Sequence, residues 1–243
     1  DCEIFPVVNA MFELIFGKSP YKSPTEMGVN MAGNCIIDDE ACREASKQEI
    51  IRRYYKCLCE KRRNGTTKDD ICKLELLMKQ AEITVEDRKV TIVALEREKN
   101  ENGNPAMAIE LRDGTIVSGG TSELLGAASS ALINALKVLA GIDKEVKLID
   151  PKAIDPIQDL KINYLGSKNP RLHTDEVLTA LSATAANNEI AMKAMKKLPL
   201  LKGCDAHSTV LLSSVDEQIF KKLGIQLTCE PKYEEDERMY HKN

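Results

Sequence analysis

The sequence predicts an α+β fold, in which a helical segment over residues 1–88 precedes a mixed α/β subdomain over residues 89–243. Acidic residues open and basic residues close the stretch 39–63, as expected of a long helix whose dipole they complement. From Lys89 the residues KVTIVALERE alternate between apolar and polar, which is the period of a strand. Further on, Asp113-Gly114 separates two apolar runs and is typical of a tight hairpin turn.

The first 88 residues show mainly helical patterns. An apolar run predicts the opening helix, and Pro20 with Pro24 predicts an irregular connector over residues 19–33. The helix over 39–63 should stop at Asn64-Gly65, because glycine readily closes a helix. The predicted helices and the capped turn that follows them cover residues 5–16, 39–63, 67–81 and 84–87.

Residues 89–243 should form a mixed sheet with helices packed on it. The first of these helices is apolar nearly all round, so we expect it to be buried against the sheet. The expected strands cover residues 89–98, 106–111, 115–118, 146–149, 207–213 and 225–229. The expected helices cover residues 122–140, 151–162, 174–197 and 215–223, with an irregular loop over 164–173.

The composition excludes several classes of protein. Apolar residues make up 43% of the chain, but no run reaches the ~18 apolar residues that a membrane-spanning helix needs. A net charge of −4 and an aromatic content of 4% argue against nucleic acid as a partner. The eight cysteines form no C-x-x-C pair, which favours buried, reduced thiols in a cytoplasmic protein over a structural zinc site. The chain begins without Met in an apolar run, as expected of part of a longer protein.

Four long blocks of the sequence are specific enough to compare with known families: SPYKSPTEMGVN, REASKQEIIRRYYK, YLGSKNPRLHTDEVLTALS and CDAHSTVLLSSVDEQIFKKLGIQLTCEPKY. In these blocks the chain resembles the carboxyl-terminal half of the uncharacterised bacterial family called domain of unknown function 1846. The resemblance implies a P-loop-like amino-terminal domain outside this chain, a helical segment, and a final subdomain whose topology resembles that of cytidine deaminases. It implies no cofactor in this chain and places any nucleotide in the missing domain. It supplies no catalytic residue.

The chain itself lacks the motifs of those two classes. Gly17-Lys18-Ser19 is no P-loop, because Phe12 stands where the motif needs glycine. The helix after the hairpin reads SELLGAASSAL, without the His and Cys of zinc deaminases. Zinc-dependent deamination is therefore disfavoured.

The candidate catalytic residues are His173, His207 and Asp216. Histidine is the side chain best suited to proton transfer near neutral pH. The order Asp205, His207, Ser213, Asp216 is similar to the zinc site of JAMM-type metallopeptidases, which would make the chain a hydrolase. A capping box at residues 214–217 is the alternative interpretation of the same segment. Because Asp205 stands in place of the first histidine, the site would have two carboxylate ligands and one imidazole, so we predict no bound zinc.

Two segments are candidates for binding an anion. The first is the turn of Gly119, Gly120, Thr121 and Ser122. It precedes a helix, where backbone N–H groups can meet a ligand, although a simple tight turn is the alternative. The second is the loop 166–173, whose candidate residues are Lys168, Asn169, Arg171 and His173. These groups could bind a phosphate or carboxylate, although a solvated connector is the alternative.

Together the two segments predict one cleft in an enzyme that acts on a small anionic substrate. The alternative is a non-catalytic assembly or regulatory module, because the apolar opening helix would otherwise leave its side chains exposed. Those side chains are Phe5, Val8, Phe12, Leu14 and Phe16. In this alternative the helical segment docks on the missing amino-terminal domain or on a second copy, which gives a homo-oligomer.

Overall fold

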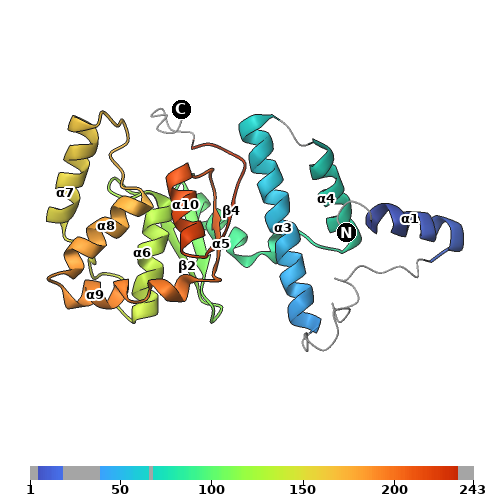
Figure 1. Cartoon of the computed structure of the whole chain (residues 1–243), viewed down its shortest axis with the longest axis horizontal. Helices are drawn as coiled ribbons and strands as arrows, with labels where there is room; N and C mark the ends of the chain where they lie inside the picture. Colours follow the sequence, from blue (N-terminus) through green and yellow to red (C-terminus); the bar gives the residue numbers. More distant parts are fainter. Residues whose placement is uncertain (1–4, 19–38, 66–67, 235–243) are drawn as a thin grey trace. The chain divides into compact units, whose positions relative to one another are not determined.

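A computed structural model of the chain describes residues 5–18, 39–65 and 68–234 (Figure 1). The chain divides into two compact units, residues 1–88 and 89–243. The first contains helices and the second a four-stranded mixed sheet with helices, so the fold class is α+β, as expected. The expected connector over 19–33 lies outside the described residues, as do Cys2 and Cys35.

The first unit contains α1 (Phe5–Phe16), α3 (Asp39–Asn64), α4 (Lys68–Gln80) and the 3-10 helix η2 (Val85–Asp87). Ile51 and Tyr55 lie one turn apart on α3 and pack with Leu77 of α4 in a small core. The three helices and the capped turn expected from the sequence are confirmed. The expectation of buried cysteines is wrong for this unit, where Cys42, Cys57 and Cys59 are half-buried and Cys72 is exposed.

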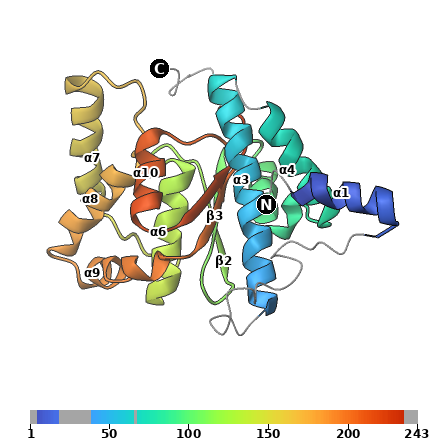
Figure 2. The same cartoon turned by 45° about the vertical axis from the view of Figure 1, so that its right-hand side comes forward.

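The sheet of the second unit has the order β2-β1-β3-β4, and its strands β2 and β3 are labelled in Figure 2. Its strands are β1 (Ala106–Glu110), β2 (Ile116–Gly120), β3 (Asp205–Ser208) and β4 (Gln226–Cys229). Strand β1 is antiparallel to both β2 and β3, and β3 is parallel to β4. The expected hairpin of β1 and β2 is confirmed, and Gly114 adopts the positive φ of 83° that its turn requires.

Helices cover both faces of this sheet. Helix α5 (Lys89–Asn100) packs on one face and α6 (Ala127–Ala140) on the other, with α8 (Thr174–Ala185) and α9 (Glu189–Met195) outside α6. Helix α10 (Ser214–Lys222) packs beside α8 and β4 (Figure 1). The remaining helices are α7 (Pro151–Asp159), the π-helical turn η3 (Leu160–Tyr164) and the 3-10 helix η4 (Leu198–Leu201).

The expected strand over residues 89–98 is wrong, because these residues belong to α5. The buried residues of α5 are Val90, Thr91 and Ala94, which share one face of a helix. Val90 and Ala94 pack against Ala108 of β1. Its β-branched residues favoured a strand in the sequence, and burial of this helical face against the sheet outweighed that preference.

Two further expectations about this unit are wrong. Residues 146–149 form an irregular, bent segment rather than a strand, and Leu148 and Ile149 contribute side chains to the main core. The single helix expected over 174–197 is divided into α8 and α9, because Asn188 caps a new helix by accepting a hydrogen bond from the nitrogen of Ile190 at 2.9 Å.

Two other boundaries are shifted. The helix expected from residue 122 begins at Ala127, because the nitrogen of Ser122 donates to the carbonyl of Leu125 at 2.9 Å in a preceding turn. The strand expected over 207–213 covers only residues 205–208. Residues 209–213 instead lead into α10, where they reach the site described next.

Candidate functional site

A pocket of about 50 Å³ lies in the second unit where α6, α8 and α10 begin. Residues 126–129 line it at the start of α6, while His173 and Ser213 line it as the N-caps of α8 and α10. Further polar lining comes from Asn169 and Arg171 and from Glu234. Each helix start carries the positive end of a helix dipole, so the pocket favours negative charge.

The loop before α8 is tied to the start of α6. The nitrogen of Leu172 donates to the carbonyl of Leu124 at 2.9 Å, and the buried Ser129 hydroxyl donates to the carbonyl of Leu172 at 3.0 Å. These bonds satisfy backbone groups of a segment that belongs to no helix. Of the two segments that the sequence suggested as sides of one cleft, the loop 166–173 lines this pocket through Asn169, Arg171 and His173, whereas the turn 119–122 lines it only through Thr121.

His173 and Asp216 form an ion pair in the pocket wall. The Nδ1 atom of His173 lies 3.0 Å from Oδ2 of Asp216. The hydrogen bond and charge of Asp216 raise the pKa of His173 above its usual value of 6.5. Burial alone would raise the pKa of Asp216, but the hydrogen bond and charge of His173 outweigh it, and with bonds from Thr174 and Ser213 lower this pKa to about 2. Each group therefore favours the charged form of the other, the imidazolium of His173 and the carboxylate of Asp216.

Asp216 also holds the start of α8 in place. Its Oδ1 atom accepts hydrogen bonds from the nitrogen of Thr174 at 2.9 Å and from the Thr174 hydroxyl at 2.8 Å. Its Oδ2 atom accepts a further bond from the Ser213 hydroxyl at 2.7 Å. The carboxylate thus lies between serine and histidine, whereas a nucleophilic serine needs the histidine between itself and the carboxylate. A carboxylate with a pKa of about 2 is also too weak a base to activate Ser213.

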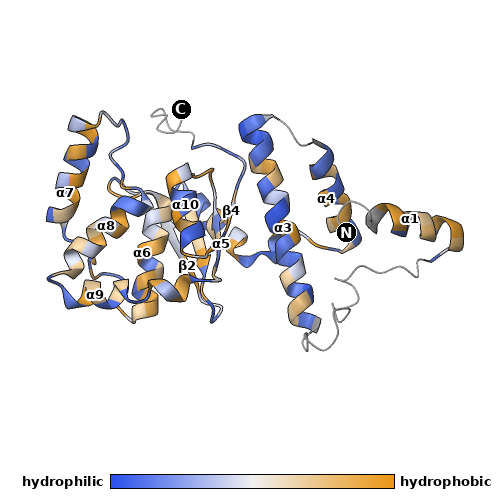
Figure 3. Cartoon of the chain, viewed as in Figure 1, coloured by the Kyte–Doolittle hydropathy of each residue, from blue (hydrophilic) through white to orange (hydrophobic). Residues whose placement is uncertain are grey.

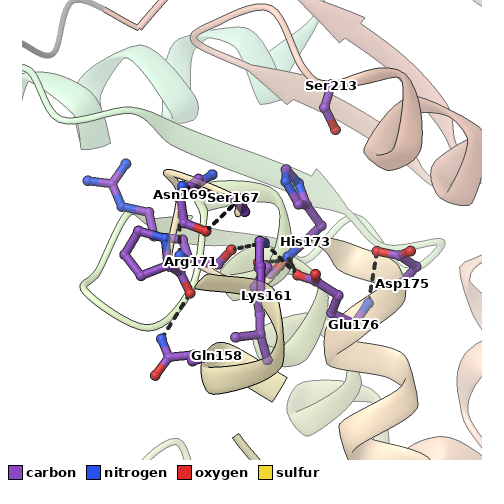
Figure 4. A network of polar contacts seen from close by, with 12 residues as sticks. Gln158, Lys161, Ser167, Asn169, Arg171, His173, Asp175, Glu176 and Ser213 are labelled. Atoms are coloured by element: carbon purple, nitrogen blue, oxygen red, sulfur yellow. Dashed lines mark hydrogen bonds and ion pairs between the residues drawn. The ribbon is translucent and has the colours of Figure 1, made fainter. Parts of the chain in front are cut away.

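A buried lysine fixes the shape of the loop (Figure 4). Lys161, whose side chain is 8% exposed, donates to the carbonyl of Arg171 at 2.6 Å and to Oε2 of Glu176 at 2.8 Å. The same carboxylate oxygen accepts from the nitrogen of His173 at 2.7 Å. Figure 4 shows the His173 side chain directed away from this lysine and toward the segment that carries Ser213. Lys161 and Glu176 thereby fix the backbone from which His173 and Arg171 project.

Arg171 is paired with a carboxylate from the end of the described chain. Its Nη1 atom lies 2.6 Å from Oε1 of Glu234, and the two side chains are 20% and 15% exposed. Both residues line the pocket. The pocket wall therefore contains two cations, Arg171 and His173, each beside an anion.

The structure brings some of the predicted binding residues to this pocket and not others. Thr121, Asn169, Arg171 and His173 line it. Gly119, Gly120 and Ser122 are absent from the described lining, as is Lys168, which is exposed to solvent. Gly119 instead allows close packing, because a Cβ atom there would lie 2.2 Å from the nitrogen of Ala131 on α6. Gly120 approaches the side chain of Glu101 in the same way.

His207 lies away from the pocket, on the α5 face of the sheet. In the antiparallel pairing of β3 with β1, His207 lies opposite Ala108, whose side chain packs against α5. The neighbouring Ala206 faces the other side of the sheet and belongs to the main core. The side chain of His207 is fully buried, with Nδ1 at 2.9 Å from the Thr228 hydroxyl. Asp205, His207 and Asp216 do not form the cluster that a JAMM-like site would need, and no group of three such ligands occurs among the described residues. Asp216, which the sequence grouped with His207 in a peptidase-like site, is instead hydrogen-bonded to His173.

Sequence reasoning missed three charged residues of the site. Glu176 stands three positions after His173, which is the spacing of a capping box and could have indicated it. Lys161 stands just before the loop, in a stretch predicted as helix, and Glu234 stands 63 positions after Arg171, so neither gave a signal of its contact with the loop. The start of α6 was missed because the sequence placed the beginning of that helix at residue 122.

Comparison with known families identifies the chain as a member of a family without an assigned activity. Residues 1–82 match the model described as domain of unknown function DUF1846, N-terminal, and residues 86–240 match the model of its C-terminal domain. The chain therefore belongs to the DUF1846 family. The expectation that it resembles the carboxyl-terminal half alone is wrong, because its first 82 residues match the amino-terminal model.

Curated relatives carry the name UPF0371 protein. The chain is 54% identical over 234 residues to one from Corynebacterium glutamicum (strain R), covering 96% of this chain and 47% of the relative. It is 54% identical over 243 residues to one from Streptococcus sanguinis (strain SK36), covering 100% of this chain and 49% of the relative. The chain thus spans about half the length of these relatives. Among its described helices, none has both the length and the apolar composition needed to cross a membrane.

Proposed function

We propose that the chain is part of an enzyme that acts on a small anionic substrate, and that the pocket at the start of α6, α8 and α10 holds the anionic group. The convergence of three helix N-termini on one pocket that also contains Arg171 and His173 carries this proposal. Backbone N–H groups, a guanidinium and an imidazolium are the donors that bind phosphate and carboxylate most strongly. A volume of about 50 Å³ holds a few waters, which suits one such group and not a whole nucleotide.

His173 would serve as the proton donor of the reaction. The hydrogen bond and charge of Asp216 raise the pKa of His173 and so favour the protonated imidazole, which can give a proton to a substrate oxygen. Asp216 would then orient the ring through Nδ1 and stabilise its charge. We expect this enzyme to act in the cytoplasm, and any nucleotide that it uses to bind outside this pocket.

Binding of inorganic phosphate and of acetate, measured by isothermal titration calorimetry, tests the site. We expect Arg171→Gln to weaken binding by about tenfold, the factor that one charge-assisted hydrogen bond typically supplies. Lys168→Gln is the matched control, because Lys168 is an exposed cation on the same loop and does not line the pocket. Equal loss of affinity in both variants would show general charge attraction and contradict the proposal.

The exposed face of α1 favours a second candidate function, assembly with another copy of the chain. Figure 3 shows α1 as largely hydrophobic. Val7, Met11, Leu14 and Ile15 are 57%, 56%, 88% and 63% exposed and share one face of the helix. If copies associate through this face, light scattering of the chain should show a dimer or larger species that Leu14→Ser reduces in size and Glu13→Ser, on the opposite face, does not. A monomer in every case would contradict assembly.

A further inference from the structure

The segment after β4 runs from the sheet to the pocket. The nitrogen of Glu230 donates to the carbonyl of Ser208 at 2.9 Å, which extends the pairing of β3 with β4 by one bond. Next, the nitrogen of Leu211 donates to the carbonyl of Lys232 at 2.8 Å, and the Lys232 side chain forms an ion pair with Glu98 at 2.8 Å. Residues 230–234, which we call the strap, are thereby fastened beside the pocket that Glu234 lines.

The strap places a carboxylate on the cation that the proposed substrate would use. Glu234 lies 2.6 Å from Arg171, in a contact that is largely shielded from solvent. With Asp216 beside His173 and Glu234 beside Arg171, each of these two basic side chains of the pocket wall already has a carboxylate beside it. A further anion would therefore be buried beside two carboxylates, which is unfavourable unless one of them leaves.

The two carboxylates differ in how firmly they are held. Asp216 is bound by the His173 ring, by the nitrogen and hydroxyl of Thr174, and by the Ser213 hydroxyl. Its removal would also uncap α8. Glu234 stands on the strap, outside any helix or strand, and is held there by its contact with Arg171. Glu234 is thus the anion that can leave when a substrate enters.

We propose that Glu234 is an internal competitor, whose carboxylate occupies Arg171 until the oxyanion of a substrate, a carboxylate or a phosphate, displaces it. This inference rests on the proposed function and adds its regulation. Because the competitor belongs to the same chain, it lowers the apparent affinity for every anion that uses Arg171 by a constant factor. Displacement releases the end of the strap, while the bonds at Glu230 and Lys232 keep the strap close to the pocket.

Glu234→Gln tests this inference with the same calorimetric probes, inorganic phosphate and acetate. The amide keeps the size of the side chain and removes its charge, so we expect both probes to bind about tenfold more tightly than to the wild-type chain. If the affinity for one probe rises more than that for the other, this probe identifies the oxyanion, carboxylate or phosphate, that the site binds. Glu145→Gln makes the same change of net charge at a side chain that is 83% exposed and outside the pocket, and it should bind as the wild type does.

A second variant, Glu98→Gln, tests the same inference in case Glu234→Gln does not fold. Glu98→Gln removes the ion pair that fastens the strap through Lys232, and it should raise affinity in the same direction by a smaller factor. If the wild type binds the probes and neither variant binds them more tightly, the internal competitor is disproved while the anion site stands. If neither the wild type nor any variant binds a probe, the proposed function fails together with the inference.

Discussion

The pKa of His173 is raised and that of Asp216 is lowered by their contact, and these two shifts set the pH range over which the pair stabilises the fold. The pKa of His173 is raised above 6.5, so its contribution is complete below pH 6.5 and is lost as the pH rises through the raised value. The pKa of Asp216 is lowered from 3.8 to about 2, so its contribution is present above pH 3.8 and is lost as the pH falls toward 2. The pair therefore stabilises the folded state most between pH 3.8 and pH 6.5.

His173→Gln should change the pH dependence of stability on the alkaline side. We expect the free energy of unfolding of the wild type to decrease as the pH rises above 6.5 and His173 loses its proton, and that of the variant to change less. Urea unfolding followed by circular dichroism measures both. Lys168→Gln should follow the wild type, because this exposed residue lies on the same loop but outside the pocket. The same slope for wild type and His173→Gln would refute the account of the ion pair.

At the residue scale the sequence identified chemical types better than partners. His173 and Asp216 were both candidate catalytic residues, but the sequence did not pair them with each other, because they stand 43 positions apart. Arg171 was predicted to bind an anion, and the structure gives it an internal carboxylate, Glu234. Such pairings depend on tertiary packing, which local patterns do not encode.

At the scale of elements, local signals were reliable where the chain carries its own stop and start residues. The hairpin was predictable because Asp113-Gly114 determines its turn, and the helix over Asp39–Asn64 was predictable from its charged ends. Helix α5 was not, because its ten opening residues favour a strand until the sheet buries one helical face. The break between α8 and α9 depends on Asn188, one capping residue in an otherwise helical run.

The packing of α6 on the sheet can be tested at Gly119. A Cβ atom there would lie 2.2 Å from the backbone nitrogen of Ala131, so Gly119→Ala must push α6 away from β2. We expect a loss of roughly 1–3 kcal/mol in the free energy of unfolding, the usual cost of overpacking. Gly126→Ala is the control, because a Cβ atom there meets nothing within 4 Å. A loss no larger for Gly119→Ala than for Gly126→Ala would contradict this role of Gly119.

At the scale of the whole molecule, the candidate site belongs entirely to the second unit, within the match to the C-terminal family model over residues 86–240. Its three helix starts come from separate parts of that unit, at Ala127, Thr174 and Ser214. The sequence could predict each helix but not their meeting point, which the sheet and the bonds of Leu172 and Asp216 determine. The site therefore depends on the fold of the whole unit rather than on one motif.

The most direct test of the central claim is a titration of the ¹⁵N-labelled chain with inorganic phosphate, followed by nuclear magnetic resonance. If the pocket holds the anionic group of a substrate, the amide signals of Ala127, Ala128 and Ser129 should shift saturably, together with the imidazole of His173. The amide of the exposed Lys168 should shift less. Phosphate-dependent shifts that leave the start of α6 and His173 unchanged, or no saturable shift at all, would contradict the claim.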